Sequence, residues 1–554
     1  MPSTLLATFK AALALTATAT IGYASTIRPP PGTFPAARGF GLERRAPGVS
    51  GKPWIRSFNL SVPIDHFHND SRYEPHSDGH FNLRYWLDAS NYKEGGPVIV
   101  LHSGEFNSQD RLAYLDYGIV SILTKATGGV GLILEHRYYG TSFPTANLTF
   151  ENLRFLTTEQ ALADTAYFAK HVQFYGLEHH NLTAPNAPWI LYGGSYAGSV
   201  AAFARKLYPD IFWGAISSSG PLQAIDNFWQ FFEVSRRYAP ADCSVTQQKL
   251  VHVIDTMLFS NDSRDATRIK KVFGLEYLWD DEFAGLLSAT WGRFQNTNWD
   301  PKLNDTSFNA YCTTITSNSL LFQNATSLRS EVERAVILAG YKGEAELLST
   351  QMLNWIGYTR KKMERLGEWC RKKDLRECIS GRFDQPNTRL DAGFMRTWGY
   401  QTCTEWGLFQ SGEGFPEDVL PVVSRAYTYE YAAMNCRRQF NMTTRPNVQA
   451  INKLGGFQFS FPRVAIIDGT HDEWRAATPH AFGQRDRNST TTEPFILIDG
   501  AAHHWDENGL KEEDEGKAGL LPEAVAKTQA MEVEFVKAWL REFDSVKSGK
   551  VVEG

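Results

Sequence analysis

The chain has 554 residues, of which 42% are hydrophobic and 13% aromatic. This is enough apolar material for a large core and for more than one domain. The formal net charge is −5, so neither nucleic acid nor an anionic membrane surface is expected as a main partner.

Residues 1–25 have the pattern of a secretory signal peptide. Lys10 precedes an apolar, alanine-rich stretch, and Gly22-Tyr23-Ala24 offers small residues at the cleavage positions. The stretch is short and rich in threonine, which argues against a membrane span, and no later stretch is long and apolar enough to cross a bilayer. We therefore expect a protein that enters the secretory route without a membrane anchor.

Residues 26–50 are rich in Pro, Gly and Arg and include the dibasic pair Arg44-Arg45. We interpret this segment as a disordered leader or as a propeptide that is cut after Arg45. An uncut tail is the alternative interpretation.

Two further features agree with secretion. The chain contains six cysteines, an even number, and no Cys-x-x-Cys spacing that would favour zinc. It also contains several Asn-x-Ser/Thr sequons. The sequons are at Asn59, Asn69, Asn147, Asn181, Asn261, Asn304, Asn324, Asn441 and Asn488.

Short apolar runs alternate with helical patterns between residues 51 and 220. A helical pattern covers Glu159–Val172, and a second helix should follow Ser195 as far as Leu207. This alternation predicts the first part of an α/β domain with a largely parallel sheet. The expected strands are Phe81–Leu87, Pro97–Leu101, Val130–Glu135, Trp189–Tyr192 and Gly214–Ser218.

Residues 221–455 have few strand patterns, and helical periodicity and aromatic residues dominate. We predict a helical cap inserted into the sheet domain. All six cysteines lie in this segment, and pairing of sequence neighbours is expected. The expected pairs are Cys243–Cys312, Cys370–Cys378 and Cys403–Cys436.

The strand and helix order returns in residues 456–554, the expected second part of the α/β domain. Arg463–Ile467 and Phe495–Ile498 are predicted strands, and an amphipathic helix is predicted near Pro522–Phe543. A sheet domain interrupted by a disulfide-stapled cap is therefore the expected architecture.

The run from Trp189 to Gly198, WILYGGSYAG, has the form of a nucleophile elbow. In such an elbow a serine occupies a strained turn between a strand and a helix, and small neighbours let the backbone pack closely. Ser195 would be the nucleophile. Because Ala197 holds the last glycine position of Gly-x-Ser-x-Gly, a simple Gly/Ser-rich turn is the alternative interpretation.

A serine nucleophile needs a base, and the base needs a group that orients it. In α/β-hydrolases an acid and then a histidine follow the serine, each after a strand. Two predicted strand ends supply that order, with Asp468 or Asp472 as the acid and His503 or His504 as the base. His471 also lies beside Asp472, but it precedes the expected base strand.

Several blocks of the chain resemble the serine peptidase family of lysosomal prolyl carboxypeptidase, dipeptidyl-peptidase II and the fungal acid prolyl endopeptidases. The resemblance covers most of residues 55–545, and the Glu-His-Arg-Tyr-Tyr-Gly block is its most specific motif. The matching blocks are Phe58–Phe67, Glu135–Ser142, Glu159–Asp164, Gly193–Gly198 and Trp398–Glu405.

The resemblance also distinguishes between the alternative acids and bases. The family's Asn-Gly-x-x-Asp-Pro-Trp aligns with DGTHDEW, which makes Asp472 the triad acid. Its Gly-Gly-Ala-His-His-Leu-Asp aligns with GAAHHWD, which favours His503 over His504. This implies an active enzyme in which Ser195 attacks a peptide carbonyl and His503 acts as general base.

Two positions depart from the family pattern. Asp468 replaces its Asn, and Glu473 replaces its Pro, so two extra carboxyl groups flank Asp472. Because like charges disfavour each other's ionisation, these groups are expected to shift the pH optimum or to mark altered activity.

The resemblance implies cleavage on the carboxyl side of proline, and the family's members include acidic enzymes. By resemblance, Trp398 and Tyr400 are candidates for the proline pocket, with ordinary cap core as the alternative. Glu105 and Glu405 are candidates for binding a substrate amine, which would make the enzyme an aminodipeptidase. The long cap resembles the fungal endopeptidase branch, so endopeptidase and exopeptidase modes both stay open.

Backbone N–H groups should form an oxyanion hole. One is expected from Tyr196, directly after the nucleophile, and the other from the loop near Gly104 or Glu105. No metal or cofactor is expected in this mechanism.

The sequence therefore predicts a secreted or vacuolar serine peptidase that acts on peptides or proteins containing proline, as a monomer or homodimer. A secreted carboxylesterase or lipase with the same elbow is one alternative, although the Glu-His-Arg-Tyr-Tyr-Gly block argues against it. A non-catalytic binding protein on a hydrolase scaffold is the other alternative.

Overall fold

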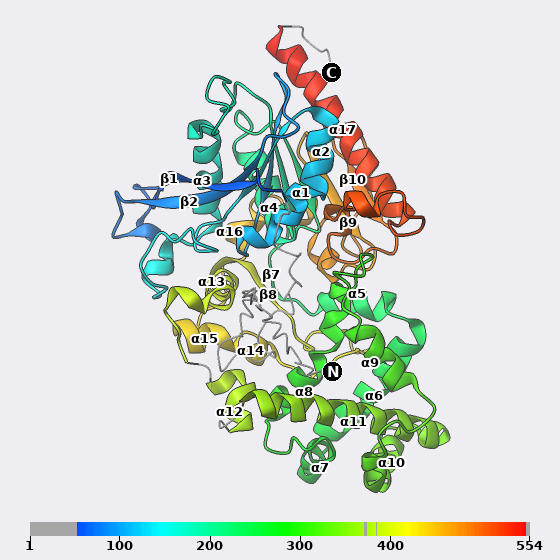
Figure 1. Cartoon of the computed structure of the whole chain (residues 1–554). Coiled ribbons are helices and arrows are strands. Elements are labelled where there is room, and N and C mark those ends of the chain that lie inside the picture. The colour runs from blue at the N-terminus through cyan, green and yellow to red at the C-terminus, as the bar shows by residue number, and fades with distance from the viewer. Residues whose placement is uncertain (1–51, 371–373, 384, 550–554) are drawn as a thin grey trace, which may run out of the picture.

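The computed structural model describes residues 52–370, 374–383 and 385–549 (Figure 1). The expected signal peptide at 1–25 and the expected leader at 26–50 lie outside the described residues. A sheet flanked by helices forms the upper part of the view, and a helical part lies below it. No helix within the described ranges combines the length and the apolar character needed to span a bilayer.

Eight strands form one sheet in the order β1-β2-β4-β3-β5-β6-β9-β10. Strand β2 is antiparallel to both β1 and β4, and every other neighbouring pair is parallel. The strands are β1 Arg56–Pro63, β2 His80–Asp88, β3 Val98–His102, β4 Val130–Leu134, β5 Trp189–Gly194, β6 Gly214–Ser218, β9 Val464–Gly469 and β10 Phe495–Ile498.

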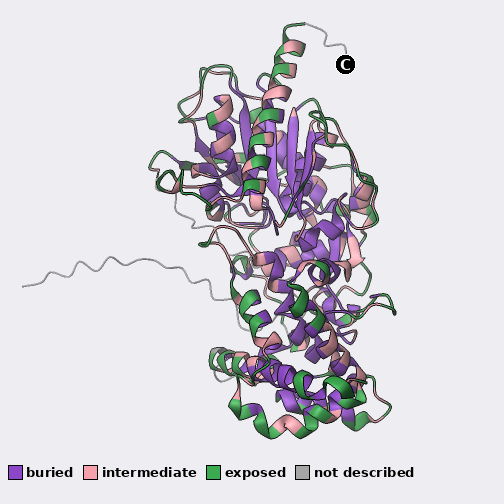
Figure 2. Cartoon of the chain, turned by 90° about the vertical axis from the view of Figure 1, so that its right-hand side faces the viewer, coloured by how far each residue is buried: buried purple, intermediate pink, exposed green. Residues whose placement is uncertain are grey.

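The central strands are buried on both faces, as their continuous apolar runs predict. Because successive side chains of a strand point to opposite faces, β3 contributes to two cores. Val98 and Val100 belong to one core, whereas Ile99 and Leu101 belong to the other. Figure 2 shows these strands as the most uniformly buried part of the chain.

Helices cover both faces of the sheet. Helices α3 (Thr158–His171) and α4 (Tyr196–Leu207) pack into the core that contains Val98. Helices α2 (Ile119–Thr127) and α17 (Glu523–Lys547) pack into the core that contains Ile99. A mostly parallel sheet between two helical layers, with the serine turn directly after β5, is the α/β-hydrolase arrangement, and this confirms the expected fold class.

The chain between β6 and β9 is mainly helical, and it forms the lower part of Figure 1. It also contains a two-stranded parallel sheet of β7 (Ile225–Asn227) and β8 (Gly407–Phe409). Its α-helices are α5 Gln230–Tyr238, α6 Ala241–Leu258, α7 Ser263–Phe273, α8 Asp280–Ser288, α9 Ser307–Thr316, α10 Arg329–Leu338, α11 Ala345–Cys370, α12 Leu375–Ile379, α13 Phe394–Gln401, α14 Tyr429–Ala432, α15 Met434–Phe440 and α16 Gln449–Asn452.

Three disulfides staple this helical segment, and they join the cysteines in the expected pairs. Cys243–Cys312 closes a sequence separation of 69 residues, Cys403–Cys436 one of 33, and Cys370–Cys378 one of 8. Disulfides of this kind persist in oxidising compartments. Cys403 follows α13, so its disulfide restrains the helix that reaches towards the sheet domain.

Removing the Cys403–Cys436 disulfide should lower stability by about 3–4 kcal/mol, because the cross-link restricts a long loop of the unfolded chain. Replacing both cysteines by serine and following urea unfolding measures this loss. The matched control is the Cys370/Cys378 double serine variant, which opens a shorter loop and should lose only about 2.5 kcal/mol. Equal losses from the two variants would contradict the loop-length explanation.

Candidate active site

Ser195 occupies a strained turn between β5 and α4. Its backbone has φ 58° and ψ −136°, a region that residues other than glycine rarely adopt. The Ser195 N–H donates to the carbonyl of Ser218 at 2.9 Å, which fixes the turn against β6. A Cβ atom on Gly193 would lie 2.0 Å from the carbonyl oxygen of Ala197, so only glycine allows this approach of strand and helix.

The serine, a histidine and an aspartate form a continuous hydrogen-bonded line. The His503 Nε2 atom lies 2.9 Å from the Ser195 Oγ atom. The His503 Nδ1 atom lies 3.0 and 3.1 Å from the two carboxylate oxygens of Asp472. Ser195 is 8% exposed and Asp472 is fully buried, so the line runs from an accessible hydroxyl into the protein. This is the geometry in which a base can accept a serine proton while an acid orients the base.

The alternative acids and bases have other partners. The carboxylate of Asp468 accepts from Thr478 Oγ1 at 2.8 Å and lies 2.6 Å from His480 Nδ1. The His504 N–H donates to Ser219 Oγ, and the His504 ring lies against the carboxylate of Glu507. The ring of His471 packs against aromatic side chains instead.

Asp506 joins the loop that carries His503 to the strands on both sides of the elbow. One of its carboxylate oxygens accepts from Ser218 Oγ and the other from the Tyr192 hydroxyl, each at 2.6 Å. Tyr192 belongs to β5, Ser218 to β6, and Asp506 lies three residues after His503. The contacts therefore fix the spacing between nucleophile and base.

Asp472 and its neighbour Glu473 are both buried but titrate in opposite directions. Burial raises the pKa of Asp472, but the charge and hydrogen bond of His503 and the donors Ser219 and Trp474 outweigh it and hold this pKa below the usual value. Burial raises the pKa of Glu473 well above the usual value, and the negative charge of Asp472 adds to this effect. The Ser235 hydroxyl and the Gln295 N–H lower the pKa of Glu473, but they only partly offset this rise. The surroundings therefore favour the ionised form of Asp472 and the neutral form of Glu473.

Tyr196, the residue after the nucleophile, anchors a buried polar chain. The His136 Nδ1–H donates to the carbonyl of Arg137, since a carbonyl oxygen can only accept. Burial lowers the pKa of His136 to about 4, which favours the neutral ring. The other ring nitrogen then accepts from the Tyr196 hydroxyl at 3.0 Å. The same hydroxyl accepts from the amide of Gln401 at 2.8 Å. Gln401 belongs to α13, so this chain joins the elbow to the helical segment.

Residues of the Glu-His-Arg-Tyr-Tyr-Gly block contact several neighbouring segments. The Glu135 carboxylate accepts from Arg84, Ser108 and Ser142, which draws three segments together after β4. A Cβ atom on Gly140 would lie 1.8 Å from a Glu135 oxygen, so glycine is required there. The role of this motif is therefore structural: its residues hold the loops that pack behind the elbow.

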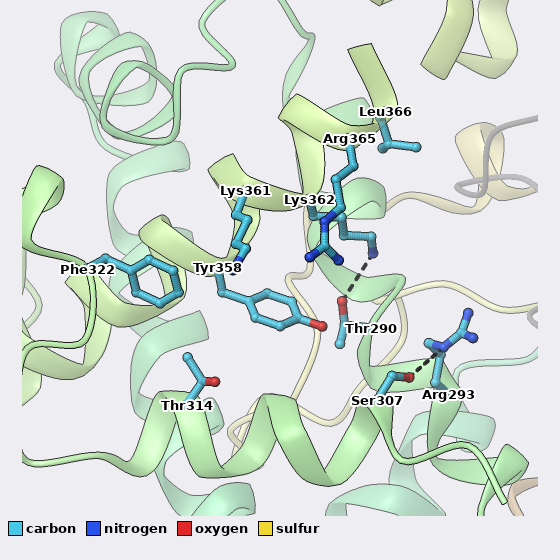
Figure 3. Close-up of a pocket in the computed structure, with 10 residues that line it drawn as sticks. All are labelled: Thr290, Arg293, Ser307, Thr314, Phe322, Tyr358, Lys361, Lys362, Arg365 and Leu366. Carbon is cyan, nitrogen blue, oxygen red and sulfur yellow. Dashed lines mark hydrogen bonds between the residues drawn. The ribbon is translucent and has the colours of Figure 1, made fainter. Parts of the chain in front are cut away.

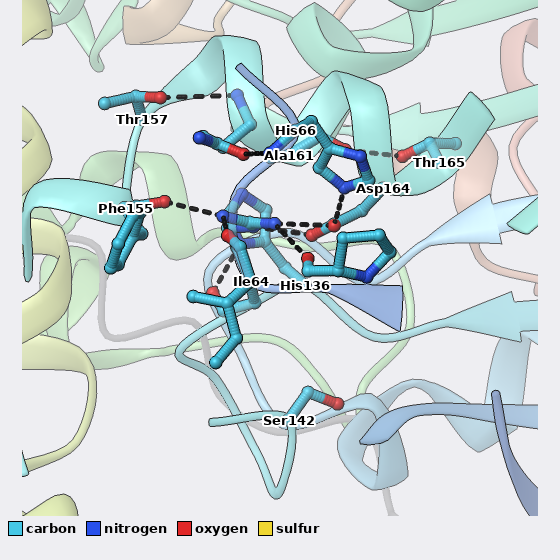
Figure 4. Close-up of polar contacts among 12 residues, drawn as sticks. Ile64, His66, His136, Ser142, Phe155, Thr157, Ala161, Asp164 and Thr165 are labelled. Carbon is cyan, nitrogen blue, oxygen red and sulfur yellow. Dashed lines mark hydrogen bonds and ion pairs between the residues drawn. The ribbon is translucent and has the colours of Figure 1, made fainter. Parts of the chain in front are cut away.

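Arg137 of the same block forms a buried ion pair with Asp164, which Figure 4 labels together with His66, Ile64 and Phe155. Its Nε and Nη2 atoms donate to the two oxygens of Asp164 at 2.6 Å each, and its Nη1 atom donates to the carbonyls of Ile64 and Phe155. His66 lies 2.7 Å from the same carboxylate. Burial raises the pKa of Asp164, but the charge of Arg137 outweighs it and holds the pKa below the usual value. The pair therefore stays ionised and fully hydrogen-bonded.

Aromatic side chains gather beside the elbow. The ring of Trp398 lies 5.3 Å from the ring of Tyr196 in an edge-to-face arrangement. Phe394 stacks with Trp398 on one side and with Phe106 on the other, the latter at 4.9 Å between centroids. We call Phe106, Tyr196, Phe394 and Trp398 the aromatic group.

Trp398 and Tyr400 lie on different sides of α13, because residues two apart on a helix do not share a face. Tyr400 packs against Phe150 and Phe440, away from the aromatic group. Phe394 precedes Trp398 by four residues and shares its face. Of the two expected pocket residues, the structure therefore brings only Trp398 to the elbow. The spacing of Phe394 and Trp398 was the signal that could have identified Phe394.

The two expected amine-binding glutamates have different surroundings. Glu405 is buried, and its Oε2 atom accepts from both the N–H and the hydroxyl of Thr158 at 3.0 Å. Thr158 is the first residue of α3, where a carboxyl group is favoured by the helix dipole. Glu105 is also buried, in the loop that follows β3. The carboxyl group of Glu405 is thus engaged in holding α3.

The loop after β3 lies against the first turn of α4. A Cβ atom on Gly104 would lie 3.2 Å from the Cβ atom of Ala197. The Gly104 N–H, however, donates to His102 Nδ1 at 3.2 Å, so this expected oxyanion donor already has an acceptor. Tyr196 is the first residue of α4, and N–H groups at that position have no acceptor within the helix.

The sequons lie at the surface of the described chain. The side chains of Asn147 and Asn304 are partly buried, and the other sequon asparagines are exposed. The Asn147 Oδ1 atom accepts from the Asn152 amide, and the Asn304 Oδ1 atom accepts from the Asn298 N–H. The exposed sequon asparagines are therefore more accessible to glycosylation than Asn147 and Asn304.

Among the described residues, one group brings three possible metal-ligand atoms within 4.8 Å of one another: Asp65, His68 and His76. The Asp65 carboxylate already accepts from the Phe67 N–H and from Gln160, and it lies 2.7 Å from His76 Nδ1. The group lies in the loop between β1 and β2, at the opposite edge of the sheet from β9 and β10. It has no contact with the serine site.

The sequence matches the family described as Serine carboxypeptidase S28 over residues 63–518. A probable extracellular serine carboxypeptidase of Arthroderma benhamiae is 45% identical over 487 residues, which cover 87% of this chain and 67% of that protein.

More distant relatives match over similar lengths. The serine protease vicPa of Bipolaris victoriae is 28% identical over 77% of this chain and 81% of its own length. The prolyl carboxy peptidase like protein 5 of Caenorhabditis elegans is 26% identical over 87% of this chain and 89% of its own length. These matches confirm the resemblance drawn from the motifs: the chain belongs to the Serine carboxypeptidase S28 family and is a serine peptidase.

Proposed function

We propose that this chain is a secreted peptidase that hydrolyses the bond on the carboxyl side of proline, with Ser195, His503 and Asp472 as its catalytic triad. The observation that carries the proposal is the unbroken contact line from the Ser195 hydroxyl through His503 to Asp472. Membership of a serine peptidase family supports the reaction class.

In this mechanism the Ser195 Oγ atom attacks the peptide carbonyl while His503 Nε2 takes the hydroxyl proton. Asp472 keeps the other ring proton on Nδ1 and stabilises the charged imidazole. The Tyr196 N–H, at the start of α4, donates to the oxyanion, and a second donor comes from the loop after β3. His503 then gives its proton to the leaving amine, and a water activated by the same ring hydrolyses the acyl-enzyme.

The aromatic group supports proline as the preferred residue before the cleaved bond. A prolyl ring is compact, apolar and lacks an N–H, so flat aromatic faces suit it and no polar partner is needed. Trp398 packs against the ring of Tyr196, the residue directly after Ser195, and we place the prolyl side chain against this group. A charged or long polar side chain would lose its hydration there without gaining a partner.

We propose a carboxypeptidase mode. The relative of Arthroderma benhamiae, which bears the name of an extracellular carboxypeptidase, supports this choice and also supports secretion of the chain. The contact of Glu405 with Thr158 argues against an amine-binding role for that carboxyl group. Peptides or proteins with proline next to the C-terminal residue would be substrates, and neither nucleic acid nor a membrane would be a partner.

Buried acids support work at acidic pH. Burial raises the pKa of several carboxyl groups, and a group whose pKa is higher in the folded chain costs stability as pH rises above its usual value of about 4. The groups are Asp255 (to about 6), Glu405, Glu473, Asp506 and Glu532.

Buried histidines act in the opposite direction. Burial lowers the pKa of His136 to about 4 and that of His102 well below 6.5. Unfolding lets these rings take up protons below pH 6.5, so they cost stability as pH falls through that range. Between about pH 4 and 6.5 the two sets therefore act in opposite directions, and the buried carboxyl groups are the set that favours acidic pH.

Product mapping by mass spectrometry tests the proposed reaction. Peptides with proline next to the C-terminal residue should lose that residue between pH 4 and 7, and the Ser195→Ala variant should be inactive. The same peptides with an amidated C-terminus should be cleaved poorly by a carboxypeptidase.

Equal cleavage of doubly blocked peptides with internal proline would instead establish an endopeptidase, and release of N-terminal dipeptides an aminodipeptidase. Hydrolysis of short-chain esters alone would contradict the peptidase mechanism. No turnover and no labelling of Ser195 by a fluorophosphonate would favour a non-catalytic protein.

Replacing Trp398 by leucine should lower selectivity for proline, because it removes one face of the aromatic group. We expect the ratio of kcat/KM for proline to that for alanine before the cleaved bond to fall about tenfold or more. Tyr400→Leu is the matched control, since Tyr400 belongs to the same helix but faces Phe150 and Phe440. A similar loss of selectivity in both variants would contradict the assignment.

Replacing Glu473 by glutamine should raise stability at neutral pH and change it little at pH 4.5. The glutamine keeps the shape of the protonated acid but has no proton to lose, so its advantage grows as pH rises above about 4.5. We expect Tm at pH 7 to rise by a few degrees relative to the wild type. The exposed residue Glu417 gives the control variant Glu417→Gln, which should show no such pH dependence. A uniform shift at both pH values would contradict the argument.

A further inference from the structure

A cavity of about 670 Å³ lies within the helical segment, between α9, α11 and the 3-10 helices η5 (Trp291–Asn296) and η6 (Gln323–Leu328) (Figure 3). Its volume is in the range that holds a small organic molecule. None of the triad residues lines it. It is therefore a separate site.

Cations dominate the lining of the cavity. Arg293, Lys361, Lys362 and Arg365 line it, and no acidic residue is among its lining residues. Asp305, beside the cavity, accepts from Arg293 at 2.5 and 3.0 Å. The carboxylate of Asp305 therefore offsets the charge of Arg293. No carboxylate in the lining offsets the other three cations.

The polar groups converge at one end of the cavity. The Lys362 Nζ atom donates to Thr290 Oγ1 at 3.2 Å, and Arg293 Nε donates to Ser307 Oγ at 2.8 Å. Figure 3 shows the guanidinium group of Arg365 and the hydroxyl of Tyr358 pointing to the same region. Several donors thus face a single space, as in sites that hold phosphate or carboxylate groups.

Lys362 is held where its own charge is disfavoured. Burial lowers the pKa of Lys362 to about 8, and the positive charge of Arg293 adds to this effect. The positive charges of Arg293 and Lys362 repel each other, and an anion placed between them would relieve this repulsion. The arrangement is therefore suited to an anionic ligand.

The other end of the cavity is apolar and rigid. Phe322 lines it, together with the ring of Tyr358. The segment of Phe322 is fixed to α11, because the Leu321 N–H donates to the buried Asn354 side chain at 2.8 Å. A ligand with an aromatic or aliphatic body would bury that body against these side chains.

We propose that this cavity binds a small organic anion, whose phosphate or carboxylate groups contact Arg293, Lys362 and Arg365 and whose apolar body packs against Phe322 and Tyr358. The converging donors and the excess of cations favour the phosphate or carboxylate groups of the ligand. The apolar end selects an organic anion over an inorganic one.

Calorimetric titration of the full chain at pH 7 and low salt tests the proposal with phenyl phosphate, inorganic phosphate and phenol. Phenyl phosphate should bind more tightly than inorganic phosphate, and phenol should not bind measurably. The Lys362→Met/Arg365→Gln double variant should weaken phenyl phosphate binding by about tenfold or more, since each charged hydrogen bond contributes strongly.

The Lys271→Gln variant is the matched control, because Lys271 is an exposed cation of α7 that does not line the cavity. It should bind phenyl phosphate as the wild type does. Peptidase activity of all variants should equal that of the wild type, which shows that they are folded. Undiminished binding in the double variant would overturn the placement of the site, and equal affinity for phosphate and phenyl phosphate would overturn the organic ligand. No binding of either anion would overturn the proposal as a whole.

Discussion

The tight turn at Ser195 is the constraint around which the site is organised. A serine at φ 58° is unfavourable by itself, so neighbouring contacts must hold it there. The Ser218 carbonyl accepts the serine N–H, and Gly193 lets α4 pack directly onto the end of β5. Asp506 then connects the strands on both sides of the turn to the loop of His503. The nucleophile and its base are thus positioned by the same part of the sheet.

The helical segment completes the site through two contacts on opposite sides of the triad. On one side, Gln401 donates to the hydroxyl of Tyr196, directly after the nucleophile. On the other side, the Trp474 indole donates to Gln295 at 2.6 Å, two residues after the triad acid. The segment therefore does more than cover the sheet, because its packing fixes residues adjacent to both ends of the catalytic line.

Much of the sheet domain could be predicted from the sequence because its strands are continuous apolar runs between turn residues. The predicted strands at Gly214–Ser218 and Phe495–Ile498 coincide with β6 and β10. Strand β1 has no such run, since it lies at the sheet edge and alternates apolar with exposed polar residues. A half-exposed edge strand gives a weak signal, and it was not predicted as a strand.

The site was predictable to the extent that it depends on local sequence. Motif and order identify Ser195 and the two strand ends that carry the acid and the base. The family resemblance then selects Asp472 over Asp468 and His503 over His504. The contact of Glu405 with Thr158 joins residues 247 positions apart, and no local pattern reveals it. The role of Trp398 and the different environment of Tyr400 depend on which face of α13 meets the elbow, and only tertiary packing decides this.

The neighbouring acids Asp472 and Glu473 show how environment divides one residue type into two roles. Asp472 has donors from His503 and Trp474, and these keep it ionised in spite of complete burial. Around Glu473 the Ser235 hydroxyl and the Gln295 N–H do not outweigh the effect of burial, so its pKa stays well above the usual value. A second carboxylate beside Asp472 would be repelled by the first, so both burial and the charge of Asp472 act against ionisation of Glu473. Of the two adjacent acids, only Asp472 therefore presents its carboxylate to His503, and this division depends on surroundings that the sequence alone does not reveal.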